Sequence, residues 1–338
     1  MSAWADHEER ITIARKSRVR AGAALTSTLL GEVPVGTRFA CYGSETLADG
    51  VERVAVGPAH GDGPAKWGRR GWLSAKQLRP PRSRVRVGLC FLVYDAPKHQ
   101  DLWRAFLRDV DPNRFRVFVH SKTPETARVD LPSAAILDDP VETEWASIAL
   151  VHATFRLFGA ARDAGCDVFL LLSDTMLPLI SFDAVVARLA RSTFQIQTTP
   201  SKKELGDRTG SYDNFIRPKL PATAKLARGD VLKGNMFFAL YRDDFEAIEA
   251  APHVAAFDKI WGGAPDEYYW INAMTIHGRP YAAPGTFLFC SRDIGGATAA
   301  ETWTLDGPLL RETAGFAFLR KVETVALDAR PAYLARIS

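Results

Sequence analysis

The sequence predicts an α/β domain with a parallel sheet, preceded by a small all-β domain. Three observations support this fold class. The chain has 338 residues, 47% apolar and 24% charged, which is typical of folded proteins and long enough for two domains. Before residue 80, short apolar alternations are separated by turn residues. After it, patterns of buried strands and amphipathic helices alternate.

Residues 8–80 have the pattern of a small β-barrel. Strand-length runs such as SRVRAG and GVERVAVG recur between Gly, Pro and Ser, without a helical period. Residues 17–79 resemble bacterial-type SH3-like domains, which implies that fold and at most a binding role. The matching positions are 19–22, 27, 31, 34–37 and 71–74. Residues 79–83 (RPPRS) predict a stiff linker, because adjacent prolines favour extended backbone.

The second predicted domain, residues 84–338, starts with the run VRVGLCFLVY at residues 85–94. This run is typical of a strand buried on both faces. The pattern then predicts helices over 99–110, 144–161 and 182–189, and strands over 115–120, 168–172 and 194–198. We expect a long loop over the polar residues 199–225. This order predicts a parallel sheet with helices on both faces and ligands at the carboxyl ends of its strands.

Charge, cysteines and motifs exclude several function classes. The net charge of +4 is weak evidence for nucleic acid, and we expect no such partner. The four cysteines are too far apart for a Cys-x-x-Cys site, and neither a P-loop nor a G-x-S-x-G motif is present. No apolar run reaches the length of a membrane span and no signal peptide is visible, so we expect a cytoplasmic protein.

Metal-ligating patterns are also lacking in the sequence. The only Asp-x-Asp is Asp109-Val110-Asp111, which precedes a predicted strand rather than following one. A motif for a metal and a nucleotide would be misplaced there, so the turn at the end of a helix is the simpler interpretation. We therefore expect no metal ion and no cofactor.

Six motifs follow one another in a fixed order between residues 88 and 322. They are VFVH at 117–120, WASI at 145–148, LLLSDTMLPL at 170–179, KGNMFFALYR at 233–242, PDEYYW at 265–270 and FLRKV at 318–322. In this order they resemble the core-2/I-branching β-glycosyltransferase family, which includes relatives of peptide xylosyltransferases. The resemblance implies a GT-A (Rossmann-like) domain. It also implies inverting, metal-independent transfer of a GlcNAc-type or xylose-type sugar from a UDP-sugar to a hydroxyl of a glycan or glycoprotein.

The resemblance also implies roles for individual residues. Glu267 matches the family's catalytic base, which takes the proton of the acceptor hydroxyl. Lys321 matches a lysine that stabilises the leaving diphosphate in place of a metal. Its partner arginine is Arg292, Arg311 or Arg320. Two simpler interpretations compete with these roles. Glu267 could be a helix-capping acid, since acids are favoured in a first helical turn. Arg320 and Lys321 could form a solvated basic edge.

Further candidates flank these residues. On the donor side they are His120, Ser121, Ser173 and Asp174, and on the acceptor side Lys233, Asp266, Tyr268 and Trp270. Most of them have a simpler interpretation. His120 could be a core histidine, Asp174 a turn cap and Asp266 a helix cap. Lys233 could be a surface lysine, and Tyr268 and Trp270 could belong to the core.

Two other functions remain open from the sequence. The chain could be a Mn²⁺-dependent GT-A transferase of another family, in which case EDTA would abolish its activity. It could also be an SH3-like adaptor with an inactive transferase-like domain. The presence of both Glu267 and Lys321 favours an active enzyme.

Overall fold

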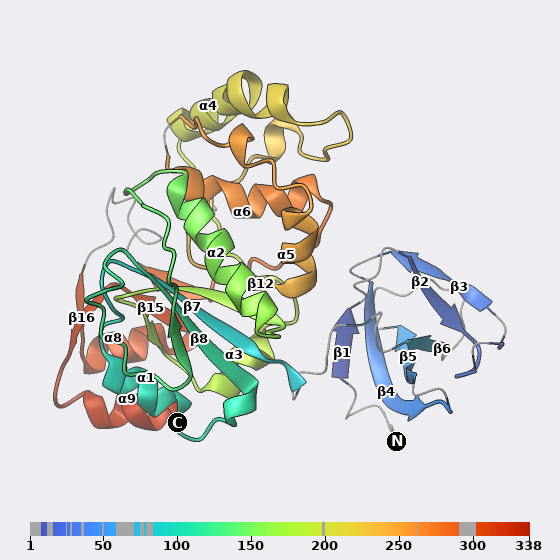
Figure 1. Ribbon diagram of the computed structural model, residues 1–338, viewed down its shortest axis with the longest axis horizontal. Helices are drawn as coiled ribbons and strands as arrows, with labels where there is room; N and C mark the ends of the chain where they lie inside the picture. Colours follow the sequence, from blue (N-terminus) through green and yellow to red (C-terminus); the bar gives the residue numbers. More distant parts are fainter. Residues whose placement is uncertain are drawn as a thin grey trace. The chain divides into compact units, whose positions relative to one another are not determined.

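The computed structural model describes residues 8–11, 16–24, 26–27, 29–34, 37–48, 51–58, 71–74, 78, 84–197, 200–261, 263–290 and 302–338. The chain divides into two units, Met1–Val85 and Arg86–Ser338 (Figure 1). The predicted linker at residues 79–83 and the candidate Arg292 lie outside the described residues.

The first unit contains a six-stranded antiparallel sheet in the order β1-β4-β5-β6-β2-β3. Its strands are β1 (Glu8–Ile11), β2 (Lys16–Arg20), β3 (Leu29–Pro34), β4 (Arg38–Thr46), β5 (Glu52–Pro58) and β6 (Gly71–Ser74). Alternating residues meet in one apolar core, consisting of Val19, Val33, Phe39, Val54, Val56, Leu73 and Leu78. The alternation in the sequence therefore places one face of the strands inward.

The second unit alternates strands and helices. Its strands are β7 (Val87–Val93), β8 (Phe115–Ser121), β9 (Ala134–Ile136), β10 (Val168–Ser173), β11 (Leu177–Pro178), β12 (Ala239–Tyr241), β13 (Leu288–Cys290), β14 (Trp303–Leu305), β15 (Phe318–Arg320) and β16 (Val322–Val325). Its α-helices are α1 (Gln100–Leu107), α2 (Ala149–Asp163), α3 (Phe182–Arg188), α4 (Lys202–Ser211), α5 (Arg242–Glu249), α6 (Pro265–Ile276), α8 (Gly307–Glu312) and α9 (Arg330–Ile337). None of the described helices is both long and apolar enough to cross a lipid bilayer.

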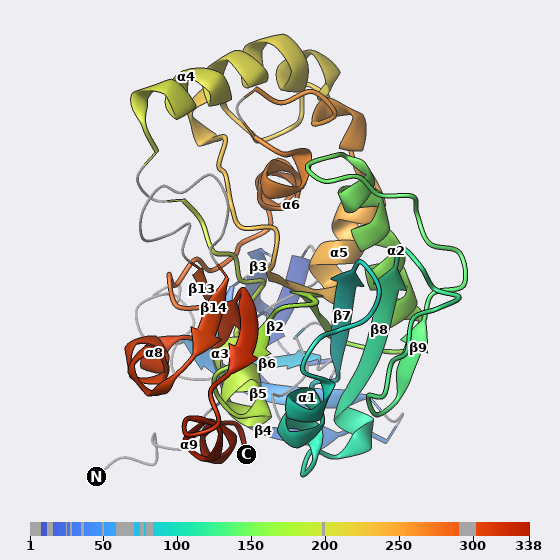
Figure 2. The same ribbon diagram turned by 90° about the vertical axis from the view of Figure 1, so that its left-hand side faces the viewer.

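The central sheet of this unit has the order β12-β10-β7-β8-β9. Strands β10, β7, β8 and β9 are parallel, and β12 joins the edge in the opposite direction. All residues of β7 and β10 are buried, as their continuous apolar runs predict. Figure 2 shows β7, β8 and β9 side by side. The predicted α/β architecture with a parallel sheet is confirmed.

Neighbouring residues of β7 show that helices cover both faces of this sheet. The Cys90 thiol lies 3.9 Å from the carbonyl oxygen of Leu157 in α2. The next side chain, Phe91, packs edge-on against Trp103 of α1, with ring centroids 5.0 Å apart. Successive side chains of a strand point to opposite faces. Helices α2 and α1 therefore cover opposite faces of β7.

Two smaller sheets join distant parts of the chain. In the first, β15 pairs antiparallel with β11 and parallel with β13. In the second, β14 and β16 are parallel. Because β11 comes only a few residues after the end of β10, this pairing brings the segment after β15 to the carboxyl end of the central sheet.

The structure differs from the sequence prediction in three segments. Helix α2 begins at Ala149 rather than at residue 144, because Ala146 has a left-handed backbone with φ of 59°. In place of the strand predicted over 194–198, the described residues 194–197 contain an isolated bridge at Ile196, and another lies just before them at Thr193. The predicted loop over 199–225 contains α4, whose first turn has a capping box between Ser201 and Glu204.

A buried ion pair provides a test of the packing in the second unit. The Asp244 carboxylate is fully buried, accepts a hydrogen bond from Ser192 Oγ at 2.5 Å, and lies 2.6 Å from Arg279 Nε. Asp244→Ala removes the acceptor of Ser192 and one of the two ion-pair partners of Arg279, which keeps its contact with Asp243. We therefore expect a loss of about 1–3 kcal/mol in the free energy of unfolding. Urea denaturation measures this change in the free energy of unfolding. Asp130→Ala removes the exposed pair with Arg104 and should cost less than about 1 kcal/mol; equal losses would contradict the prediction.

Candidate active site

Glu267 lies in the first turn of α6, as the sequence predicts. Pro265 begins the helix, where its missing amide hydrogen has no cost, and acids in this turn are favoured by the helix dipole. Eleven of the twelve residues of α6 are buried, so the helix runs through the interior of the unit. Glu267 is 8% exposed and Asp266 7% exposed. A helix start that supplied only surface caps would leave such acids in solvent.

Lys233 contacts Glu267 directly. Its ammonium nitrogen lies 3.2 Å from Glu267 Oε2, and the side chains are 19% and 9% exposed. The backbone supports this pair, because the Gly234 amide donates to the Glu267 carbonyl at 2.8 Å. The Lys233 carbonyl in turn accepts from the Gln197 amide at 2.9 Å. The structure thus brings the KGNMFFALYR and PDEYYW motifs together around one carboxylate.

A polar network on α4 extends this site and was not predicted. Arg208, 5% exposed, donates from Nη2 to Gln197 Oε1 at 2.5 Å, and Gln197 Nε2 donates to Glu204 Oε1 at 2.9 Å. The hydrogen bonds from the Gln197 side chain and from the Ser201 amide lower the pKa of Glu204 to about 2. The Ser-x-x-Glu spacing of the capping box was the available signal for this helix.

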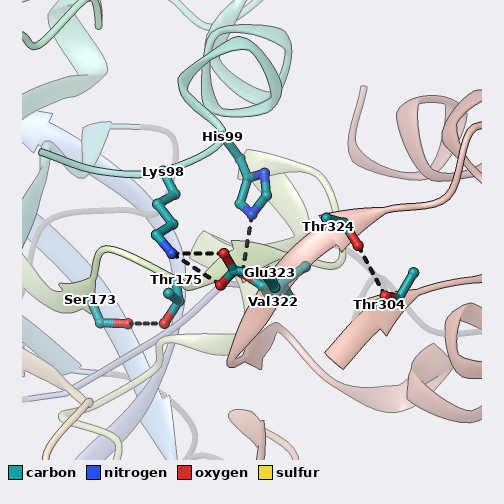
Figure 3. A network of polar contacts seen from close by, with 8 residues as sticks. All are labelled: Lys98, His99, Ser173, Thr175, Thr304, Val322, Glu323 and Thr324. Atoms are coloured by element: carbon teal, nitrogen blue, oxygen red, sulfur yellow. Dashed lines mark hydrogen bonds and ion pairs between the residues drawn. The ribbon is translucent and has the colours of Figure 1, made fainter. Parts of the chain in front are cut away.

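Four donor-side candidates, Ser173, Asp174, Arg320 and Lys321, lie together at the carboxyl end of β10. Leu177 of β11 pairs with Leu319 of β15, and the Val322 amide donates to the Thr175 carbonyl at 2.9 Å. Ser173 and Thr175 lie beside this strand, with their hydroxyl oxygens 3.5 Å apart (Figure 3). Arg320 and Lys321 are therefore next to the turn that contains Ser173 and Asp174.

Arg320 also connects this region to the KGNMFFALYR motif. The carbon at the centre of its guanidinium group lies 4.5 Å from the ring centroid of Phe237, within the range of a cation–π contact. Three motifs that are far apart in the sequence, LLLSDTMLPL, KGNMFFALYR and FLRKV, thus meet at one edge of the central sheet.

His120 and Ser121 are held by protein contacts at the end of β8. Both side chains are fully buried. The Val141 amide donates to His120 Nε2 at 2.9 Å, and burial lowers the pKa of the imidazole. Ser121 Oγ donates to the Tyr94 carbonyl at 3.2 Å and accepts from the Thr123 amide at 3.0 Å. His120 therefore fixes the segment before α2, and Ser121 fixes the turn after β8.

The remaining candidates lie in different surroundings. Trp270 is 2% exposed and belongs to an aromatic cluster, where its ring lies 4.7 Å from that of Phe155. Tyr268 is fully buried, and this burial raises the pKa of its hydroxyl. Arg311 is exposed in the last turn of α8. Helix α8 is tied to α9 by hydrogen bonds from Arg336 to the Leu310 and Thr313 carbonyls.

The arrangement offers two kinds of chemistry. Near α6, a buried carboxylate beside an ammonium group can accept a proton from a bound hydroxyl. At the end of β10, the basic residues Arg320 and Lys321 can neutralise an anionic ligand. Within the described part of the chain, no three His, Cys, Asp or Glu side chains gather into a group that could hold a metal ion.

Comparison with known proteins identifies the family. The family model Branch: Core-2/I-Branching enzyme matches residues 88–270, more than half of the chain. No curated protein matches. The matched segment contains five of the six motifs, from VFVH to PDEYYW, and ends at Trp270, before Lys321. The chain belongs to the Core-2/I-Branching enzyme family, whose members are glycosyltransferases that act on glycans.

Proposed function

We propose that this protein transfers a GlcNAc-type or xylose-type sugar from a UDP-sugar to a hydroxyl of a glycan or glycoprotein, with inversion and without a metal ion. The observation that carries the proposal is the buried Glu267 carboxylate, paired with Lys233 at the start of α6. The central sheet, with four parallel strands and one antiparallel edge strand, supports a GT-A domain over residues 84–338, because ligands of such sheets bind at the carboxyl ends of the strands.

In the proposed reaction, Glu267 is the general base. The acceptor hydroxyl gives its proton to the carboxylate while its oxygen forms a bond to the anomeric carbon. The bond between that carbon and the diphosphate oxygen breaks, and UDP leaves with the electron pair. Lys233 holds the carboxylate in place through the 3.2 Å contact, and the first turn of α6 supplies a favourable dipole.

Lys321 and Arg320 are the proposed cations for the leaving diphosphate. Negative charge grows on the diphosphate as the bond breaks, and fixed cations there lower the barrier. Arg320 ends β15, the strand that pairs with β11, and Lys321 follows it, next to the Ser173–Asp174 turn. Arg320 fits this role better than Arg311, because Arg311 belongs to the solvent-exposed end of α8.

For the first unit we propose an SH3-like fold over residues 8–80 with a binding role. The six antiparallel strands and their single apolar core support a small β-domain of this kind. Its ligand would be the acceptor or a protein partner.

Glu267→Gln tests the proposed base. The amide keeps the shape of the side chain and cannot accept the proton, so we expect kcat to fall about 10²-fold to 10⁴-fold. Release of UDP in the presence of acceptor measures the rate, and the thermal midpoint monitors folding. Glu246→Gln, an exposed substitution on α5, is the matched control and should keep full activity. Wild-type turnover by a folded Glu267→Gln variant would remove the assignment.

Lys321→Met tests the proposed diphosphate contact. Removing one charge-assisted hydrogen bond should weaken UDP binding about 10-fold to 100-fold. Isothermal titration calorimetry with UDP, in the presence of EDTA, measures the Kd. Lys259→Met removes an exposed lysine elsewhere in the same unit and should leave the Kd unchanged. If Lys321→Met binds UDP as tightly as the wild type, Lys321 does not contact the diphosphate.

A further inference from the structure

We propose that Lys98 and His99, in the turn between β7 and α1, are positioning residues that hold the backbone beside Lys321 in place for the diphosphate. The inference rests on the diphosphate role of Lys321 in the proposed function. Neither residue matches a motif of the sequence analysis, and neither needs to touch the substrate. Their contacts with two other segments carry the argument.

The turn first contacts the strand that follows Lys321. His99 Nε2 lies 3.1 Å from the Val322 carbonyl oxygen. Since a carbonyl can only accept, this ring nitrogen carries a hydrogen and donates it. The Lys98 ammonium lies 3.0 Å and 3.1 Å from the two carboxylate oxygens of Glu323. Figure 3 shows both side chains reaching from the turn to the strand at Val322 and Glu323.

The same turn also contacts the end of β10. The Lys98 amide donates to the Asp174 carbonyl at 2.8 Å, and the Thr175 carbonyl accepts from the Val322 amide at 2.9 Å. The Lys321 carbonyl accepts from the Trp303 amide at 2.8 Å. The backbone from Lys321 to Val322 is therefore held by three segments. One of them, the Lys98–His99 turn, also fixes the Ser173–Thr175 turn.

The backbone of His99 indicates that this geometry is imposed by its surroundings. Its φ of 53° and ψ of 39° lie in the left-handed region, which is uncommon for residues other than glycine, although histidine adopts it more often than most. The His99 carbonyl accepts hydrogen bonds from the Leu102 and Trp103 amides, so the residue also begins α1. Glycine would adopt this backbone at lower cost, yet it could not reach Val322. His99 thus has a backbone conformation that costs free energy, and its ring nitrogen supplies the hydrogen bond to Val322. Residues with such backbone conformations cluster at functional sites.

The test compares His99→Gly with His99→Asn in the full chain. Glycine keeps the left-handed backbone and removes the donor, whereas asparagine tolerates this backbone and has a shorter amide donor. We expect His99→Gly to raise the Kd for UDP and the KM for the donor about tenfold, with an unchanged KM for the acceptor and an unchanged thermal midpoint. His99→Asn should fall between His99→Gly and the wild type.

The matched control is His253→Gly. His253 has a similar left-handed backbone, with φ of 49°, and begins a short 3₁₀ helix after α5. This control should leave UDP binding unchanged. If His99→Gly does not fold, Lys98→Met is the second test, because it removes the contact with Glu323 and keeps the backbone. This pair is half exposed, so we expect the Kd for UDP to rise about twofold to fivefold. Arg104→Gln, which removes an exposed ion pair of α1, is its control.

A double-mutant cycle with Lys321→Met separates the two proposals. If His99 acts through Lys321, then His99→Gly has no further effect on the Kd for UDP in the Lys321→Met background. Equal effects in both backgrounds, or wild-type binding by a folded His99→Gly, would overturn the positioning role while the proposed function stands. Wild-type binding by Lys321→Met alone would instead refute the diphosphate role, and the positioning role with it.

Discussion

The backbone pairing of β11 with β15 is the constraint on which the candidate site depends. It joins Leu177, just after the end of β10, to Leu319, which lies close to the C-terminal end of the second unit. The Val322 amide extends this connection to the Thr175 carbonyl. Backbone amides and carbonyls buried at such a junction need partners, so the pairing is strongly specified. Without it, Arg320 and Lys321 would have no fixed relation to the carboxyl ends of the parallel strands.

The position of Glu267 in the site depends on how its buried charge is stabilised. Glu267 is held inside the unit by an ammonium group and by a helix start, because an unpaired carboxylate there would be costly. The Gln197, Glu204 and Arg208 network links α4 to the segment that contains Lys233, whose carbonyl accepts from the Gln197 amide. The proposed chemistry follows from this division. In the proposed reaction, the Glu267 carboxylate in α6 receives the proton, and the basic residues at the end of β10 neutralise the leaving group.

Periodicity and motif order predicted the sheet and most helices of the second unit, but not the contacts between its side chains. The continuous apolar runs of β7 and β10 and the Pro-Asp-Glu start of α6 are local signals, so the sheet and the helix could be predicted. Helix α4 was missed because its residues are polar, and the start of α2 was misplaced because the left-handed Ala146 leaves no pattern. The Lys233–Glu267 contact and the burial of Trp270 depend on tertiary packing, which a single sequence does not encode in its spacing.

In the proposed reaction, basic side chains rather than a metal ion stabilise the departing UDP. The most direct measurement is UDP release by the wild-type protein from UDP-GlcNAc and UDP-xylose, with excess EDTA and with added Mn²⁺. We expect release from one of these donors at the same rate in both conditions. Complete loss of activity in EDTA, with recovery on addition of Mn²⁺, would contradict this expectation.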